Sequence, residues 1–285
     1  MILDIIINTF NNEKTILNVY TKINDELKNI KHRFIFVDDA STDKTLETLK
    51  NIQKKNESSV KIISLSKKHG KEACFYAGLT YSKHDLVCLY DLELQANTTH
   101  ISKMYEFLTT HEEYDQVCMY SSFVEKKIMN KLNLKLVNNI YDLNIDNNRT
   151  YYRMMRRNVV NAVVELSNTY PFTNYSFELL GFNTYDLKFD NNTIDNKNTG
   201  KYIAYSTRPL YLFKIISYIL LLIAFIYFAL SIIGIIKTSN FVILLFVLIT
   251  NIINLYILSI SKKYYVKEKT YFVIKEKIGF DENVL

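Results

Sequence analysis

The chain has 285 residues, which is enough for one soluble domain of good size and a smaller part beside it. Its formal net charge of +6 is modest and fits a basic rim facing a membrane better than a nucleic-acid-binding surface. The three cysteines, Cys74, Cys88 and Cys118, are odd in number and far apart, so we expect reduced, buried thiols in a reducing compartment. The apolar run 2–7 is too short for a signal peptide and lacks a basic leader.

Apolar runs of strand length alternate with segments of helical spacing along the first part of the chain. Strands are expected over 3–8, 34–37 and 61–65 and from Leu86, and helices over 15–30, over 44–52 and through Ala73, Ala77 and Leu79. This alternation predicts an α/β fold with a doubly wound, mostly parallel sheet. Crossovers between parallel strands are almost always right-handed, so the carboxyl ends of these strands should open on one edge of the sheet.

Two carboxylates, Asp91 and Glu93, follow the apolar run that begins at Leu86. If the strand continues through them, alternation sends both side chains to the same side, with Leu92 between them. Hard oxygen ligands in that position suit Mg²⁺ or Mn²⁺ held jointly by the protein and a diphosphate. The alternative is a solvated acidic turn.

Polar side chains also follow the first two strands: Asn11, Glu13, Asp38 and Asp39. A nucleotide at this edge would find acceptors for its base and ribose near Asp39. The alternative for the Asp38-Asp39 pair is a helix N-cap, a role that Ser41 or Asp43 could fill equally well.

The middle of the chain holds an amphipathic and a cationic segment. Apolar residues within 128–143 fall on one helical face, which predicts either an ordinary core helix or a helix lying on a bilayer surface. Residues 151–157 then concentrate cations, including Arg153. Such arginines bind a phosphate bidentately or cover a solvated face.

Two apolar segments, 212–236 and 241–260, are each long enough to span a bilayer. Lysine and arginine are concentrated before the first and after the second, so the positive-inside rule places both ends and the soluble domain in the cytoplasm. We therefore expect a cytosolic domain over 1–210, a transmembrane hairpin over 211–262 and a cytosolic tail over 263–285. Asn251 and Asn254 lie inside the second span and need polar partners, so a homo-oligomer such as a tetramer is expected.

The order and spacing of the motifs resemble the family-two inverting glycosyltransferases. Within that family they are most similar to the polyprenyl-phosphate group, which includes dolichol-phosphate mannose synthases and bacterial bactoprenol glucosyltransferases. The resemblance covers nearly the whole chain. The matching stretches are 36–41 (V-D-D-G-S in the family), 70–73 (G-K-E-A), 91–95 (D-A-D-L-Q), 152–155 (F-R-L-M), 205–210 (F-S-x-x-P-L) and the closing segment 269–279.

This resemblance implies a GT-A fold, which is a Rossmann-like, doubly wound domain, with a Mg²⁺ or Mn²⁺ ion on the D-x-D motif. Carried over by position, Asp39 would contact the nucleoside, Asp91 and Glu93 the metal and diphosphate, Gln95 the sugar and Arg153 a phosphate. Lys71 of the G-K-E-A stretch is a further candidate for the donor side. The implied chemistry is an in-line displacement at the anomeric carbon with inversion. A lipid phosphate is already ionised, so a strong general base is not obligatory.

The departures from the family pattern fall mostly on the phosphate and acceptor side. Glu93 replaces the second metal aspartate, and Tyr151 replaces the acid before F-R-L-M. The late loop over 195–202 lacks its arginine, for which only Lys197 or Lys201 could substitute. The cationic segment expected near Ser121 also lacks arginines, with Lys126 and Lys127 the nearest substitutes.

The leading hypothesis is a transferase in a bacterial plasma membrane that moves a sugar, most simply from a UDP-glucose type of donor, to undecaprenyl phosphate on the cytoplasmic face. The expected partners are therefore a nucleotide sugar, a polyprenyl-phosphate lipid and a membrane, and no nucleic acid. One alternative is transfer to another cell-envelope glycan, which needs a general base that the sequence does not clearly offer. The other is a catalytically weakened relative that acts as a membrane scaffold.

Overall fold

The computed structural model describes residues 1–94, 98–121, 146, 148–189 and 270–280, together with isolated helical positions between 215 and 259. The chain divides into two compact units. The first comprises Met1–Lys126, Asn144–Lys197 and Lys269–Leu285, and the second comprises Lys127–Leu143 and Asn198–Glu268. All the described strands belong to the first unit, so this unit positions the candidate site.

An eight-stranded sheet forms the centre of the first unit, with the strand order β7-β5-β6-β4-β1-β2-β3-β8. The strands are β1 (Leu3–Thr9), β2 (His32–Asp38), β3 (Val60–Leu65), β4 (Leu86–Tyr90), β5 (Gln116–Ser121), β6 (Arg149–Arg156), β7 (Thr184–Phe189) and β8 (Ile274–Ile278). Strands β1 to β4 are mutually parallel, whereas β6 and β8 run antiparallel to the neighbours they share with this core. The predicted doubly wound α/β sheet is therefore confirmed, in a mixed form.

The parallel core has the order β3-β2-β1-β4, so the chain winds outwards from β1 in both directions. The strand order thus reverses between β1 and β4. In open α/β sheets, ligands bind in the crevice outside the carboxyl ends of the strands at such a switch point. A ligand site is therefore expected at the carboxyl ends of β1 and β4.

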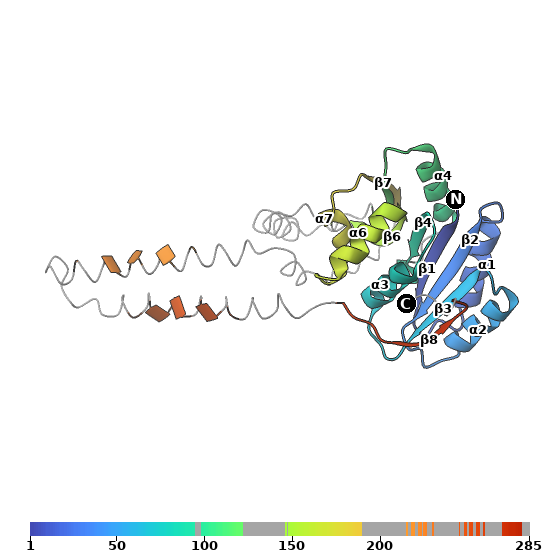
Figure 1. Ribbon diagram of the computed structural model, residues 1–285, viewed down its shortest axis with the longest axis horizontal. Coiled ribbons are helices and arrows are strands. Elements are labelled where there is room, and N and C mark those ends of the chain that lie inside the picture. Colours follow the sequence, from blue (N-terminus) through green and yellow to red (C-terminus); the bar gives the residue numbers. More distant parts are fainter. Residues whose placement is uncertain are drawn as a thin grey trace. The chain divides into compact units, whose positions relative to one another are not determined.

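Helices cover both faces of the sheet (Figure 1). The helices are α1 (Ile16–Glu26), α2 (Thr45–Lys55), α3 (Lys71–Tyr81), α4 (Thr99–Thr110), α6 (Arg157–Ser167) and α7 (Ser176–Leu179). The side chains of α1, α2 and α4 pack into one core cluster with Ile5 and Ile7 of β1, and those of α3, α6 and α7 pack into the other with Ile6. Successive residues of β1 alternate between the two cores, as a strand buried on both faces requires.

Helix α3 packs closely on β1 at Gly78. A Cβ atom added there would lie 2.3 Å from Cγ2 of Ile6, a distance that real Cβ atoms do not show. The absence of a side chain therefore lets the helix approach the strand. This contact matters for the site, because α3 begins at Lys71 beside the carboxyl ends of the strands.

Strand β8 closes one edge of the sheet by pairing antiparallel with β3, with Ile278 opposite Ile62. It comes from residues that the sequence predicted only as a cytosolic tail. An ion pair of 2.7 Å between Glu276 and Lys50 of α2 holds the strand from one side. The short, lysine-interrupted run 274–278 gives no strong strand signal of its own, so the pairing with β3 could not be read from it.

Among the described residues, no helix is both long enough and apolar enough to cross a membrane. Most residues of the two predicted spans, 212–236 and 241–260, lie outside the described residues, and the predicted amphipathic helix 128–143 lies wholly outside them. These segments and the domain boundaries at 210 and 262 stay predictions. The predicted state of the cysteines is confirmed, because Cys74, Cys88 and Cys118 are all buried and unpaired.

Candidate functional site

The loops that follow β1 and β2 are joined to each other by side-chain hydrogen bonds. Asn11 Oδ1 accepts a hydrogen bond from the backbone N–H of Thr42 at 2.9 Å, and Glu13 Oε2 accepts one from that of Lys44 at 2.9 Å. The N–H of Asn11 donates in turn to Ser41 Oγ at 3.0 Å. Asn11 and Glu13 therefore lie at the predicted edge, where they connect the two loops. Their predicted contact with a ligand stays a prediction.

Asp38 ends β2 and forms the turn that follows it. Its side chain is fully buried and accepts hydrogen bonds from the hydroxyl and the backbone N–H of Ser41, at 2.5 and 3.1 Å. Burial raises the pKa of this carboxyl, and the charges of Asp39 and Asp43 raise it further, although the Ser41 hydrogen bonds oppose them. Asp38 therefore does not cap α2, whose first N–H, that of Thr45, donates to Asp43 Oδ1 at 2.9 Å.

Asp39 connects the end of β2 to the loop before α3. Its two carboxylate oxygens accept the backbone N–H groups of His69 and Gly70 at 2.6 and 2.9 Å. Gly70 has a φ of +96°, a conformation that L side chains rarely adopt, so the tight approach to Asp39 depends on glycine. Asp39 is thus an organiser of the crevice wall, and its predicted contact with a nucleoside stays a prediction.

The structure brings together Lys71 and Asp91, which lie 20 residues apart in separate motifs. Lys71 Nζ at the start of α3 lies 3.0 Å from Oδ2 of Asp91, directly after β4. The Asp91 side chain is only 2% exposed, whereas that of Lys71 is 24% exposed. Lys71 also lies 5.7 Å from the centre of the Tyr151 ring. A buried carboxylate and a partly exposed cation therefore meet at the switch point.

The predicted alternation of Asp91 and Glu93 is wrong. Strand β4 ends at Tyr90, and Leu92–Leu94 form a short 3₁₀ helix, η1, in which three residues make a turn. The pairing of β4 with β1 stops at Tyr90, and the N–H of Leu94 then donates to the carbonyl oxygen of Asp91 at 3.3 Å, which closes the turn. A strand pleat therefore does not place the two carboxylates on one side. The side chain of Glu93 and the whole of Gln95 lie outside the described residues.

The donor atoms at the switch point fit a shared metal ion better than a metal held by protein alone. Asp91 offers the hard oxygen that Mg²⁺ and Mn²⁺ prefer, with Lys71 beside its Oδ2, whereas Asp38 and Asp39 accept hydrogen bonds from the backbone of the loops that they organise. Within the described part of the chain, no three His, Cys, Asp or Glu side chains come together as a metal cluster. Mg²⁺ is commonly held by one or two carboxylates together with substrate phosphates, and Asp91 fits that arrangement.

Arg153 is placed inside the protein. Its side chain is fully buried, its Nη2 donates to Thr150 O at 2.8 Å and to Asn174 Oδ1 at 2.5 Å, and its guanidinium lies 4.0 Å from the Phe177 ring centre. Its Nε finds no partner among the described residues. The structure therefore does not bring Arg153 to the surface of the crevice beside Asp91, and its predicted phosphate contact stays a prediction that this burial does not support.

Glu178 on α7 is a candidate that the sequence analysis missed. Its Oε2 accepts the backbone N–H of Asp146 at 2.8 Å, while its Oε1 is shielded from solvent and has no partner among the described residues. Burial raises the pKa of this carboxyl to about 7, although the nearby charges of Arg153 and Arg149 lower it. A single acid in the apolar run Phe177–Leu180 was the available sequence signal.

The strand register shows at which end of the sheet Glu178 lies. Strand β6 is antiparallel to β4, with Arg153 opposite Leu89, so Arg149 at the start of β6 lies beyond the carboxyl end of β4. Glu178 interacts with both arginines and with Asp146, which precedes β6. It therefore belongs to the same end of the sheet as Asp91. The remaining predicted residues, Lys197 and Lys201, lie outside the described residues, as do Lys126 and Lys127.

Comparison with known proteins agrees with this geometry. The family model described as "Glycosyl transferase family 2" matches residues 4–164, more than half of the chain. CsbB of Bacillus subtilis (strain 168), whose name describes it as a glycosyltransferase, is 29% identical over 205 residues. That match covers 69% of this chain and only 60% of the Bacillus protein. The prophage bactoprenol glucosyl transferase homolog of Escherichia coli (strain K12) is 24% identical over 257 residues, 84% of each chain.

A solved structure supports the fold. The crystal structure of mannosyl-3-phosphoglycerate synthase from Rubrobacter xylanophilus matches with a TM-score of 0.50 over 71% of each chain, at 13% identity. A likeness at that identity shows the fold alone. Together with the family match, it identifies the first unit as a GT-A, Rossmann-like domain with a mixed sheet.

Proposed function

The chain belongs to glycosyl transferase family 2, and on that premise we propose that it transfers a sugar from a nucleotide-sugar donor to a polyprenyl phosphate. The donor is of the UDP-glucose type, and the acceptor is undecaprenyl phosphate on the cytoplasmic face of a bacterial plasma membrane. The observation that carries the proposal is the buried Asp91, paired with Lys71 at 3.0 Å, at the switch point of the sheet.

On the donor side, each described residue has a distinct task. The turn formed by Asp38 and Asp39 shapes the wall against which the nucleoside lies. Lys71 is exposed enough to donate to a diphosphate oxygen while it stays beside Asp91. Asp91, with Glu93, would hold Mg²⁺ or Mn²⁺. When bound, such an ion stabilises the negative charge that develops on the departing nucleoside diphosphate.

The reaction is a direct displacement. An oxygen of the acceptor phosphate attacks the anomeric carbon from the side opposite the nucleoside diphosphate, so the configuration at that carbon inverts. A phosphate is already ionised near neutral pH, so the protein need not remove a proton from this acceptor. The chain's contribution is to align the two substrates and to stabilise the leaving group through Lys71 and Asp91.

Two observations support a lipid phosphate as the acceptor. The Escherichia coli relative with a bactoprenol name aligns over 84% of both chains, which includes residues beyond the family match. The apolar segments 212–236 and 241–260 are each long enough to hold the protein at a bilayer, where such a lipid is found. A homo-oligomer in the membrane belongs to the same proposal.

Glu178 favours a second candidate, which is transfer to a hydroxyl group of a cell-envelope glycan. A hydroxyl must lose a proton as it attacks, and a carboxylate with a pKa of about 7 is suited to accept that proton. The unpartnered Oε1 of Glu178, at the same end of the sheet as Asp91, is the described atom that could do so.

The proposal is tested with the full chain in detergent, incubated with Mn²⁺, radiolabelled UDP-glucose and undecaprenyl phosphate. We expect a sugar-lipid product, reduced at least about a hundredfold by Asp91→Asn and left unchanged by Asp25→Asn at an exposed position. Failure to form sugar-lipid from any common nucleotide sugar would contradict the proposal. If nucleotide binding were also missing, the scaffold alternative would be favoured.

The Glu178→Gln variant separates the two acceptors. Transfer to lipid phosphate requires no base, so the variant should retain that activity with an unchanged pH profile. If the acceptor is a hydroxyl, Glu178→Gln should lower kcat about a hundredfold and remove the acidic limb of the pH profile, since general-base catalysis contributes on that order.

A further inference from the structure

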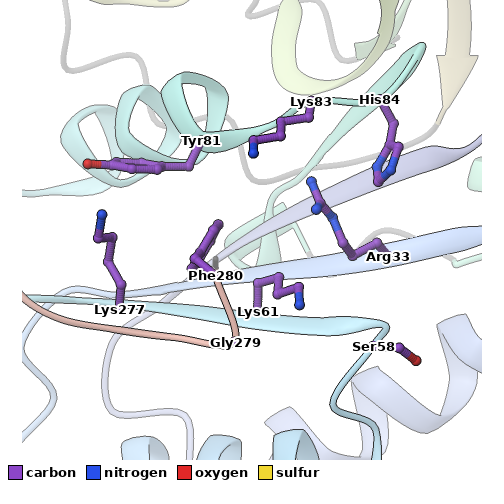
Figure 2. A pocket seen from close by; sticks show the side chains of 9 residues that line it. All are labelled: Arg33, Ser58, Lys61, Tyr81, Lys83, His84, Lys277, Gly279 and Phe280. Atoms are coloured by element: carbon purple, nitrogen blue, oxygen red, sulfur yellow. The ribbon is translucent and has the colours of Figure 1, made fainter. Parts of the chain in front are cut away.

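A pocket lies at the opposite edge of the sheet, where β2 and β3 begin (Figure 2). Its basic side chains come from the starts of these strands, from the connection between α3 and β4 and from the end of β8: Arg33, Lys61, Lys83, His84 and Lys277. Figure 2 shows the side chains of Lys83 and Lys277 entering the pocket from opposite sides. Four segments that are far apart in the sequence therefore supply cations to one space.

One buried carboxylate fixes part of this arrangement. Asp4 on β1 is fully buried and accepts hydrogen bonds from Nε and Nη2 of Arg33 at 2.8 and 3.0 Å. It also accepts one from the His84 ring at 2.7 Å and one from the backbone N–H of Lys83 at 2.9 Å. The guanidinium and the loop are thus held in place from beneath, before any ligand arrives.

The pocket has an excess of positive charge. Four of its lining side chains are Lys or Arg, and none of the described residues that line it is Asp or Glu. Asp4 balances the charge of Arg33 from below, and the exposed Lys83 and Lys277 add positive charge to the pocket. The described acids next to lining residues in the sequence, Glu57, Asp85 and Glu276, do not line the pocket. Such a concentration of donors and charge is suited to an anion.

The size of the pocket limits the ligand to a small group. Its volume is about 190 Å³, which is below the roughly 300–1,000 Å³ of sites that hold a whole drug-sized molecule. Tyr81 and Phe280 form an apolar side of the pocket, with their ring centres 5.7 Å apart. Gly279 has a φ of +81° and forms the turn that leads to Phe280 in the lining of the pocket. The space therefore fits a phosphate group on a short stem and not a nucleotide sugar.

This pocket is separate from the crevice at Asp91. Arg33 and Asp38 are five residues apart on β2, and at about 3.3 Å per residue their separation along the strand is about 17 Å. We propose that the pocket lined by Arg33, Lys61, Lys83 and Lys277 is a second anion site, which binds the phosphate group of a phosphomonoester, either free or on a lipid headgroup. The proposal does not depend on the transferase activity.

The test uses the full chain in uncharged detergent micelles with EDTA and constant ionic strength. Inorganic phosphate and dihexanoyl phosphatidic acid are titrated in turn and followed by ³¹P line broadening, with dihexanoyl phosphatidylcholine as the zwitterionic control. We expect wild type to bind the phosphate probe. The double variant Lys83→Gln/Lys277→Gln, which removes the two exposed lysines of the pocket, should weaken that binding at least about tenfold. The matched variant Lys22→Gln/Lys103→Gln, which removes two exposed lysines elsewhere, should bind like wild type.

Three further comparisons decide the source and the specificity. Binding of both probes assigns free phosphate, whereas binding of phosphatidic acid alone assigns a lipid headgroup, and both results support the site. Asp91→Ala should leave this binding unchanged.

The acids Asp281 and Glu282 follow Phe280 and lie outside the described residues, so the titration is repeated on Asp281→Asn/Glu282→Gln. The proposal would be overturned if Lys83→Gln/Lys277→Gln and Lys22→Gln/Lys103→Gln bound the probes equally well. It would also be overturned if neither wild type nor Asp281→Asn/Glu282→Gln bound either probe.

Discussion

Replacing Asp4 by Asn should destabilise the first unit strongly, because one buried carboxylate serves several donors. Asp4 accepts two hydrogen bonds from Arg33, one from the His84 ring and two from backbone N–H groups. The amide keeps the shape but loses the charge and turns one acceptor into a donor that faces other donors. Removing one partner of a buried ion pair costs about 3–5 kcal/mol. Since Arg33 is 13% exposed, the lower end is expected, which corresponds to a Tm lower by roughly 6–12 °C.

The pKa of Asp4 determines how the stability difference between wild type and Asp4→Asn changes with pH. Burial alone would raise the pKa of Asp4, but the hydrogen bonds and charge of Arg33 and the hydrogen bond from His84 hold it below the ordinary 3.8. The stability that Asp4 contributes is therefore present above its unfolded-state pKa and is lost as the pH falls through the lower folded value. The Tm difference between wild type and Asp4→Asn should be full at pH 7 and shrink below about pH 4.

Thermal melts of the full chain, followed by near-UV circular dichroism of its tyrosines, measure this difference. The control is Asp25→Asn, at an exposed pair with Lys28 whose side chains are 57% and 70% exposed. Such surface pairs contribute about 0–1 kcal/mol, so this Tm should hardly move. Equal Tm values for the two variants, or a difference that grows on acidification, would refute the reasoning.

Three other substitutions have directions that the same melts can check. Gly78→Ala should lower stability by about 1–3 kcal/mol, because its Cβ would meet Ile6; an unchanged Tm would show that α3 can shift. Ala40→Gly should raise stability by about 1 kcal/mol, because Ala40 has a φ of 57° that costs an L residue about that much; a lower Tm would contradict this. Glu178 has a raised pKa, so wild type loses stability as the pH rises from 4.5 to about 7. Glu178→Gln should therefore gain on the order of 2 kcal/mol over wild type at pH 8 and little at pH 5; the opposite trend would count against burial as the cause.

The parallel core could be predicted because its signals are local. Ile5, Ile6 and Ile7 form an apolar, β-branched run, and each following helix shows its own spacing, so β1 to β4 were found near their actual bounds. Strand β6 was not found, because its arginines suggested a charged surface. In the structure, Arg153 bonds Asn174 and Arg149 pairs with Asp186 at 2.9 Å. Those partners are distant in the sequence, so no local pattern could show that these cations lie in an inner strand.

The sequence predicts at which edge of the sheet the candidate site lies, but not the contacts within it. Right-handed crossovers are enough to bring Asp39 and Asp91 to one edge of the sheet. The pair formed by Lys71 and Asp91 depends on where α3 begins relative to the end of β4, which is a tertiary property. The turn at Leu92–Leu94 depends on where the pairing of β4 with β1 stops, and the shifted pKa of Glu178 depends on burial at α7. Neither environment is visible in the sequence.

The most direct measurement is isothermal titration of UDP and of GDP into the full chain in detergent, with Mn²⁺ and then with EDTA, beside Asp91→Ala and the control Asp25→Ala. A crevice built on Asp91 predicts metal-dependent binding of one nucleotide that Asp25→Ala retains and Asp91→Ala loses. Binding of that nucleotide by Asp91→Ala at wild-type strength, or no binding of either nucleotide by wild type, would contradict a donor site at the end of β4.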